Sequence, residues 1–446
     1  MTDTADLDRL QTIVEDARRA GADAVDAILV SGVSLSVSQR LGEPEDLERA
    51  EGWDLGLRVL VGQRQAIVSS SDPSPEASAE LISRAVAMAT AVPEDPYIGL
   101  AEPDQLAGEV DDLDEVDPVE PDADALMERA ARAEDAARAV EGVTNSEGAE
   151  ASWSQSTIAL AASNGFARQR AGSRHSVSVS VLAGEGTEME RDYDWVSAAH
   201  AEDLSDAAQV GRSAGENAVK RLGARKASTG QVPVVFDPRV ANSLVRHLAS
   251  AVSGDAVARG TTFLKDKMGE AIFADGISVI DDPLRRRGLR SKAFDAEGIA
   301  TQRREVIADG RLATWIMDLR SARQLGLQTT GHASRGTGGP PSPGVTNLYL
   351  GAGTTSRDDL IGAIDDGFYV TEMMGFGVNN ITGDYSRGAS GFWIENGALA
   401  HPVSEVTIAG NLIEMFRNLT PADDLEFRYG INAPTTRIDG MTVAGT

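Results

Sequence analysis

The chain contains no cysteine among its 446 residues. Disulfide bonds, a thiol nucleophile and thiolate metal ligands are therefore excluded. Lysine is almost as scarce, and the whole sequence holds only Lys220, Lys226, Lys265, Lys267 and Lys292. Long hydrophobic runs are also missing: stretches such as 85–91 are far shorter than the roughly 20 apolar residues of a membrane-spanning helix. The first residues are acidic and carry no basic, then apolar, secretion signal. We therefore expect a soluble, cytoplasmic protein with no membrane partner.

Positive charge is in short supply overall. The chain has 69 acidic residues against 41 Lys and Arg, which gives a formal net charge of −28. This balance argues against a nucleic-acid partner, because phosphate contacts need clustered Lys and Arg. An acidic excess with so little lysine suggests adaptation to high salt, where screening suppresses self-repulsion. The alternative is an acidic protein from an organism whose GC-rich genome favours Arg and Asp.

The length and the patterns indicate an α+β protein of two domains. The first, residues 1–225, is predicted as a mixed domain of helices and strands, and it contains an acidic, proline-rich loop at 93–121. The second, 226–446, is predicted as largely antiparallel strands with a few helices, after a small and polar linker near 223–230. The acidic loop is expected to be solvated, with a cation-binding or partner-binding arm as the alternative.

Several short patterns predict individual elements. Hairpin turns are predicted at Gly62-Gln63, Asn164-Gly165 and Asp309-Gly310, each between strand-like runs. Ser74-Pro75 is predicted to open a helix that continues to about residue 91. The polar stretch 42–48 is predicted as a turn or loop.

The most distinctive stretch is 383–397, which reads GDYSRGASGFWIENG. Glycine permits positive φ and close backbone approach, so the first part could lie as a loop beside a ligand or another chain. Residues 392–394 indicate a buried strand, with 395–397 as its turn and 398–403 as the returning strand. On pattern alone, a hairpin with an irregular lead-in is the plainer interpretation.

The sequence of this stretch resembles the C-terminal signature of the TldD/PmbA family, and more closely that of its TldE (PmbA) branch. The matching runs are 383–397, His401-Pro402-Val403 and 407–412. A second block from Gly254 to Phe273 resembles the same branch, with Thr262 in place of its serine. The resemblance covers most of the chain and is strongest from residue 232 onward.

The resemblance also bears on metal chemistry. Catalytic subunits of this family resemble zinc peptidases with an H-E-x-x-x-H helix and a later cysteine, in which the histidines face one metal and the glutamate polarises a bound water. The equivalent helix here has lost that motif: His247 is followed by Leu248, no second histidine follows, and the chain has no cysteine. We therefore interpret Arg246, His247, Ser250 and Asp255 as marking a degenerate metal-motif helix. No catalytic residue, metal ligand or cofactor is assigned to this chain, and zinc is expected in the partner subunit.

Other chemistry has weaker support in the sequence. A metal site from His247, His332 and Asp255 would require tertiary proximity, and ordinary hydrogen-bonded histidines are the favoured alternative. Ser390 lacks the final glycine of a nucleophile elbow, and the glycines near 336–339 run into prolines rather than a helix. With these kinds of catalysis set aside, the function left for this chain is to bind a peptide or a partner. The candidate residues are Asp384, Tyr385, Ser386, Arg387 and His401. The alternative is that Asp384 and Arg387 only brace the loop internally.

The resemblance implies a heterodimeric zinc peptidase in which a TldD-type catalytic subunit supplies the metal. It implies unfolded peptide as the substrate, and an association with leader-peptide removal and with toxin or gyrase-directed systems. This chain would complete the cleft. Two alternatives remain open from the residues: a homodimeric binding or regulatory protein, and a self-sufficient hydrolase with an unrecognised site.

Overall fold

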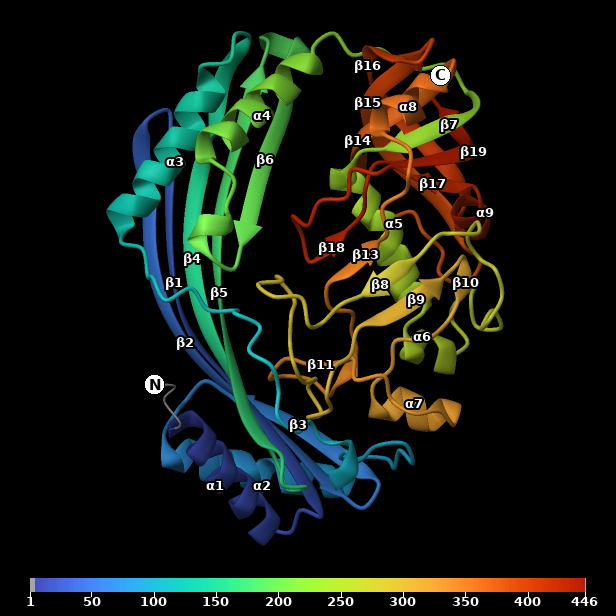
Figure 1. The fold of residues 1–446 in the computed structure, drawn as a ribbon. Coiled ribbons are helices and arrows are strands. Elements are labelled where there is room, and N and C mark those ends of the chain that lie inside the picture. Colours follow the sequence, from blue (N-terminus) through green and yellow to red (C-terminus); the bar gives the residue numbers. More distant parts are fainter. Residues whose placement is uncertain (1–4, 446) are drawn as a thin grey trace.

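A computed structural model describes residues 5–445. Its N-terminal half is built on one long antiparallel sheet of six strands in the order β3-β2-β1-β4-β5-β6 (Figure 1). The strands are β1 (Ala24–Arg40), β2 (Glu43–Val61), β3 (Arg64–Ser70), β4 (Val143–Ala162), β5 (Ala167–Ala183) and β6 (Glu190–Ala198). The hairpin turns predicted at 62–63 and 164–165 are confirmed, since they join β2 to β3 and β4 to β5.

Four helices cover one face of this sheet. α1 (Ala5–Arg19) and α2 (Pro75–Ala91) pack at one end, and α3 (Ala123–Arg138) and α4 (Ala207–Lys220) at the other (Figure 1). The odd-numbered apolar residues of β1 and β4 point toward these helices. Leu29 packs with α1 and α2, and Leu35 and Trp153 pack with α3 and α4. α2 begins at Pro75, as the Ser-Pro pattern predicted, and the side chain of Ser74 caps it by accepting from Ala77 N.

The opposite face of the sheet is polar in its upper part. Alternation of serine with apolar residues places a set of hydroxyls on the side away from the helices. We call this the serine face: Ser34, Ser36, Ser152, Ser154, Ser156, Ser176 and Ser178. Further along the same face, Ile28, Leu160 and Phe166 pack against Phe294 of the C-terminal half. The sheet therefore separates a helical layer from the C-terminal half.

The predicted loop at 42–48 is wrong, because Glu43 begins β2. The turn is shorter than predicted and uses Leu41 and Gly42, both with positive φ (54° and 84°). Glu134 of α3 fixes the turn by accepting from Leu41 N at 2.7 Å and from Gly42 N at 3.0 Å. Residues 43–52 are exposed and pair only with β1, so their acidic side chains are compatible with an edge strand.

The acidic segment 93–121 has no helix or strand except a single 3-10 turn at Pro103–Gln105. Many of its residues are exposed, as expected of a solvated loop, but several of its side chains contact the C-terminal half. Asp95 pairs with Arg320 at 2.7 Å and Asp114 with Arg287 at 2.7 Å, while Leu113 is buried. Its carboxylates thus meet arginines of the C-terminal half, which a composition-based prediction could not locate.

The C-terminal half contains a sheet that closes on itself. The order is β16-β15-β14-β7-β19-β17, and an extra β16–β19 pairing closes the ring. β14 and β7 are parallel, and the other neighbours are antiparallel. The strands are β7 (Gly230–Phe236), β14 (Asp366–Met374), β15 (Asp384–Glu395), β16 (Ala398–Asn411), β17 (Leu419–Pro421) and β19 (Thr436–Ala444).

A second sheet has the order β10-β9-β8-β13-β18, and shorter elements surround it. Its strands are β8 (Val279–Asp281), β9 (Arg304–Ala308), β10 (Arg311–Leu312), β13 (Leu348–Leu350) and β18 (Ile431–Asn432), with a separate pair β11 (Ala333–Ser334) and β12 (Ser342–Pro343). The helices are α5 (Pro238–Ala251), α6 (Gly254–Ala258), α7 (Leu319–Leu325), α8 (Arg357–Gly362) and α9 (Leu412–Arg417). The turn predicted at 309–310 is confirmed between β9 and β10.

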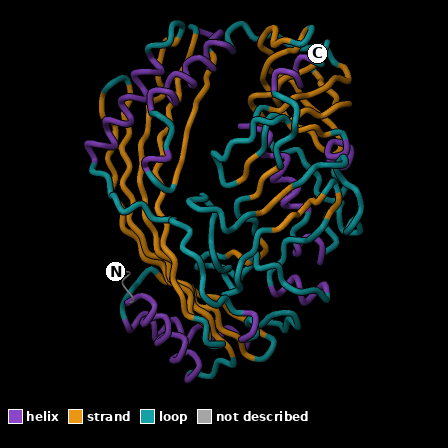
Figure 2. The backbone as a smooth tube through the Cα atoms, in the orientation of Figure 1, coloured by secondary structure: helices purple, strands orange, loops and turns teal. Residues whose placement is uncertain are grey.

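Helix α5 lies in the core of this half. Its apolar stripe, which includes Val240, Leu244 and Leu248, joins a single large cluster with residues of both sheets. Figure 2 shows mostly loops and short strands between the closed sheet and the long sheet. The mixture of helices and largely antiparallel sheets confirms the α+β prediction. Among the described residues, no helix is both long and apolar enough to cross a bilayer.

Candidate functional site

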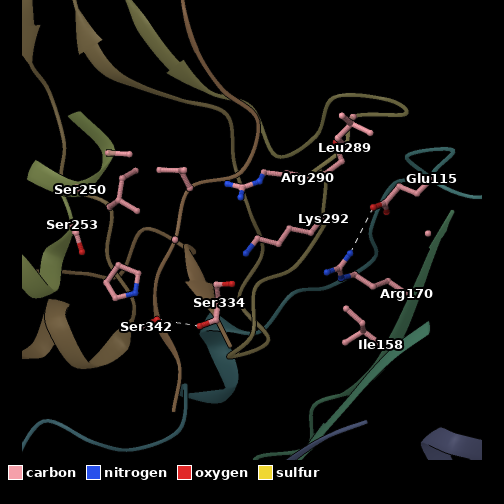
Figure 3. Close-up of a pocket in the computed structure, with 18 of the residues that line it drawn as sticks. Glu115, Ile158, Arg170, Ser250, Ser253, Leu289, Arg290, Lys292, Ser334 and Ser342 are labelled. Atoms are coloured by element: carbon pink, nitrogen blue, oxygen red, sulfur yellow. Dashed lines mark hydrogen bonds and ion pairs between the residues drawn. The ribbon is translucent and has the colours of Figure 1, made fainter. Parts of the chain in front are cut away.

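A cleft of about 1070 Å³ lies between the polar face of the long sheet and the C-terminal half (Figure 3). Its size is at the upper end of the range of roughly 300–1,000 Å³ for small-molecule sites. One wall comes from β4 and β5, and the other from the end of α5, from α6 and from segments 288–292 and 342–345. Residues far apart in the sequence therefore form the two walls of one cleft.

Strand register produces the sheet wall of the cleft. Ser154 pairs with Arg174, Ser156 with Gly172, and Ile158 with Arg170. Because alternate residues of a strand share one face, all six side-chain positions point to the same side as the serine face. No strand pairs with the other edge of β5 between 168 and 174 in the described chain. The acidic segment bonds to this edge at Ser173, whose backbone N donates to Glu115 O at 2.8 Å.

Positively charged side chains dominate the lining. They are Arg170, Arg174, Arg259, Arg290 and Lys292, whereas Glu115 supplies the only carboxylate among the lining residues of 5–445. In Figure 3 the side chains of Arg290 and Lys292 extend toward the wall that carries Ser250 and Ser253. Lys292 Nζ donates to Ala333 O at 3.0 Å. This sign of charge is the reverse of the chain as a whole.

Burial shifts several titrations around the cleft. It raises the pKa of Glu115 to about 7, against the opposing effect of Arg170 3.8 Å away. Burial also lowers the pKa of Lys292, and the charge of Asp295 opposes that shift. Asp295 itself is buried and accepts from the backbone N–H groups of residues 297, 299 and 333 at 2.8–3.0 Å. These bonds fix the loop that carries Lys292.

The degenerate motif helix borders this cleft only at its C-terminal end. Ser250 lines the cleft, and its Oγ donates to Arg246 O at 3.1 Å. Arg246 itself lines a second hollow of about 510 Å³, nearer the N-terminal end of α5. Asp255 lies on α6 and faces Arg259 at 3.5 Å and Arg320 at 3.9 Å. These positions carry hydroxyls and paired charges, not a set of metal ligands.

His247 faces an aromatic ring. Its ring centroid lies 5.9 Å from that of Tyr385 in an edge-on arrangement, and its buried Nε2 has no hydrogen-bond partner within residues 5–445. Burial, together with the charge of Arg387, lowers the pKa of His247 to about 4, so the imidazole is neutral near pH 7. The motif helix and the signature stretch thus meet here, at a packing contact.

The signature stretch forms a strand in place of the predicted loop. β15 starts at Asp384 and pairs with β16 on one edge. On its other edge β14 pairs from Gly388 onward, and residues 377–379 bond to Asp384 and Ser386, so the backbone of β15 is not free to meet a ligand. A Cβ on Gly391 would overlap the carbonyl oxygen of Tyr369. That glycine therefore serves close strand packing. The predicted turn at 395–397 is confirmed by Asn396 and Gly397, both with positive φ.

The signature side chains lie outside the large cleft. Asp384 and Ser386 are exposed, and Asp384 accepts from Asn411 Nδ2 at 3.2 Å. Tyr385 is buried, with its hydroxyl 3.2 Å from Met373 Sδ, and Arg387 Nε donates to Met374 O at 3.2 Å. These bonds show local bracing of the strand.

Two histidines outside this stretch also have local partners. His401 Nδ1 lies 3.6 Å from a carboxylate oxygen of Glu395 across the hairpin. His332 is buried and hydrogen-bonded to Asp281 at 3.0 Å. In residues 5–445 no group of three or more His, Asp or Glu side chains is arranged to hold a metal ion, so the set His247, His332 and Asp255 does not form such a site. The residues present do not fit the zinc that the family implies.

The cleft residues were missed from the sequence, although two signals pointed to them. The run 285–292, RRRGLRSK, is strongly basic in an acidic chain and contains one of the five lysines. The run 168–174, RQRAGSR, repeats arginine at strand spacing. Neither pattern predicts that residues of the two runs line the same cleft.

Comparison with known proteins identifies the family to which the chain belongs. The chain matches three metallopeptidase domains, described as PmbA/TldA metallopeptidase domain 1, central domain and C-terminal domain, over residues 25–89, 116–222 and 229–445. It is 38% identical over 426 residues to the metalloprotease PmbA of Escherichia coli O157:H7, which covers 95% of this chain and 93% of that protein. It is also 38% identical over 436 residues to a PmbA homologue of Haemophilus influenzae, covering 97% and 94% of the two chains.

Solved structures agree. A candidate modulator of DNA gyrase from Bacteroides thetaiotaomicron superposes with a TM-score of 0.92 at 27% identity over 100% of both chains. TldE from Thermococcus kodakarensis shares the fold, with a TM-score of 0.86 at 22% identity over 98% of this chain and 99% of that one. The chain therefore belongs to the PmbA/TldD family, in its PmbA (TldE) branch, and the resemblance noted in the sequence is confirmed.

Proposed function

We propose that this chain is the non-catalytic, TldE-type subunit of a heterodimeric zinc peptidase, and that its cleft holds unfolded peptide for a TldD-type partner. Zinc, its ligands and the general base come from that partner in this proposal. The observation that carries it is the end of α5, where the cleft is bordered by Ala249, Ser250 and Ser253 and not by two histidines and a glutamate.

The cleft has the features of a site for extended peptide. Hydroxyls of Ser154 and Ser156 can accept from and donate to a peptide backbone. The edge of β5 around Ala171, which no strand pairs with in the described chain, offers strand-like pairing, a common way to bind peptide of varied sequence. Holding the peptide extended and excluding water from it would orient its carbonyl for attack in the partner's site.

The test is to measure zinc content and peptide cleavage for this chain alone, for the TldD-type chain alone and for the mixture, in low and high salt. We expect stoichiometric zinc and full cleavage only when the TldD-type chain is present, with the mixture more active than that chain alone. Zinc binding or cleavage by this chain alone would contradict the proposal and favour a self-sufficient hydrolase. A stable homodimer that ignores the TldD-type chain would favour a separate binding protein.

A filled cleft gives a sharper version of this test. A Cβ on Gly172 would make only ordinary contacts, so Gly172→Phe is expected to fold and to place a ring in the cleft. We expect it to form the heterodimer but to cleave peptide slowly. Gly52→Phe is the matched control, because Gly52 is also a strand glycine with no atom within 4 Å of an added Cβ.

A further inference from the structure

The charge of the cleft is opposite to that of the protein. Acidic residues outnumber Lys and Arg by 69 to 41 in the chain, yet the described residues that line the cleft include five cations and one carboxylate. A cleft with low-dielectric walls focuses the potential of the charges that line it. An anionic ligand would therefore be repelled by much of the surface and attracted here.

Several of these cations have no carboxylate to neutralise them. In the described chain no Asp or Glu oxygen makes an ion pair with Arg174 or Arg290, and each of these side chains is exposed. Arg174 makes one hydrogen bond, to Leu289 O at 3.3 Å, and the charge of Arg290 acts against its own. Like charges held together without a counter-ion are costly unless a ligand supplies one.

The remaining cations have distant or weak counter-charges. Arg170 has Glu115 at 3.8 Å, and Arg259 has Asp255 at 3.5 Å while its own side chain is 60% exposed. Lys292 feels the attraction of Asp295 and Asp281, but also the repulsion of Arg170 and Arg290. None of these contacts has the short, two-pronged geometry of a satisfied arginine–carboxylate pair.

We propose that this cleft binds carboxylates of a peptide, so that the chain prefers peptide segments rich in Asp and Glu. Arg174 and Arg290 form the anion-binding pair, with Lys292 and Arg170 deeper in the cleft. The inference deepens the proposed function, because it specifies the class of peptide that the cleft would take. A carboxylate can come from acidic side chains or from a peptide C-terminus, and the experiment separates these sources.

The test measures binding to the full chain alone by fluorescence anisotropy, so that it is independent of cleavage and of the partner. The probe is a disordered peptide of about ten residues with several Glu, compared with the same peptide carrying Gln, each with a free and an amidated C-terminus. We expect the Glu peptide to bind at least about tenfold more tightly than the Gln peptide, with the preference shrinking as salt rises. Persistence in the amidated pair assigns the preference to side chains, and loss on amidation assigns it to the terminal carboxylate.

Two double variants locate the site. Arg174→Gln with Arg290→Gln is expected to reduce the Glu-over-Gln preference roughly tenfold, and it removes mutual repulsion, so folding is not threatened. Arg84→Gln with Arg212→Gln removes the same charge from exposed positions on α2 and α4, and is expected to bind as the wild type does. Equal binding of the Glu and Gln peptides, or equal losses in both double variants, would overturn the inference. Cleavage by the heterodimer without any acidic preference would leave the proposed function intact and refute this one.

Discussion

Replacing Glu115 by glutamine should stabilise the protein at alkaline pH and hardly at all under acid conditions. The carboxyl lies between the sheet and the C-terminal half, with its side chain 18% exposed and Arg170 at 3.8 Å. Burial raises its pKa from 4.5 to about 7. The folded state therefore holds this proton more tightly than the unfolded chain does. Folding stability must fall as the pH rises from about 4.5 to about 7, and stays reduced above that.

The magnitude follows from the same pKa difference. At about 1.4 kcal/mol for each pH unit, the step from 4.5 to about 7 corresponds to a penalty of up to about 3 kcal/mol above neutral pH. Arg170's attraction for the ionised form is already contained in that pKa. Glutamine keeps the shape and cannot ionise. We thus expect Glu115→Gln to raise the free energy of unfolding by up to about 3 kcal/mol near pH 8 and by under about 1 kcal/mol near pH 5.

Urea unfolding at both pH values, followed by tryptophan fluorescence and far-UV circular dichroism, measures this difference. Glu109→Gln is the control, because Glu109 is an exposed glutamate of the same acidic segment. A gain of equal size at both pH values would refute the titration argument. Destabilisation near pH 8 would show that the attraction to Arg170 outweighs the cost of burial.

Three further substitutions probe contacts that hold the two halves and the sheets. Asp26→Asn should cost about 3–5 kcal/mol near neutral pH, because it leaves two buried arginines without their carboxylate. The loss, measured by urea unfolding, should shrink in acid, because burial raises the pKa of Asp26 but the two arginines outweigh it and hold that pKa below its ordinary value. Glu134→Ala should cost about 1–3 kcal/mol by leaving backbone N–H groups of the β1–β2 turn unpaired, with faster amide exchange confined to that turn. Gly391→Ala should prevent β14 and β15 from pairing and abolish resistance to proteolysis in the C-terminal half, whereas Gly362→Ala, at an open position, should have little effect.

Local chemistry made much of the fold predictable. A hairpin turn depends on the few residues that form it, such as Gly165 and Gly310 with their positive φ, and both turns are found as predicted. The family could be identified from the sequence because its signature motif consists of consecutive residues, 383–397. The edge strand at 43–52 was missed because its side chains are exposed and acidic, and only pairing with β1 makes it a strand.

The cleft could not be predicted for a different reason. Arg174 and Arg290 are more than a hundred positions apart, and they meet only because the C-terminal half packs against one face of the long sheet. Sequence position carries no record of that packing. Conversely, the unusual sequence at 383–397 suggested a binding loop. Its Gly391 is instead required because β14 and β15 pack too closely to admit a side chain there.

The serine face has a consequence for how a peptide would travel across it. A hydroxyl rotates freely and serves as donor or acceptor, as the Ser152–Ser176 contact at 2.6 Å illustrates, where either oxygen can donate. Such a surface has no fixed order of donors and acceptors for a bound backbone to match. A chain lying on it can shift by one residue and find equivalent partners, with water replacing any that are lost. The serine face would then let the backbone of a bound peptide shift in small steps, while the cations of the cleft hold its acidic side chains.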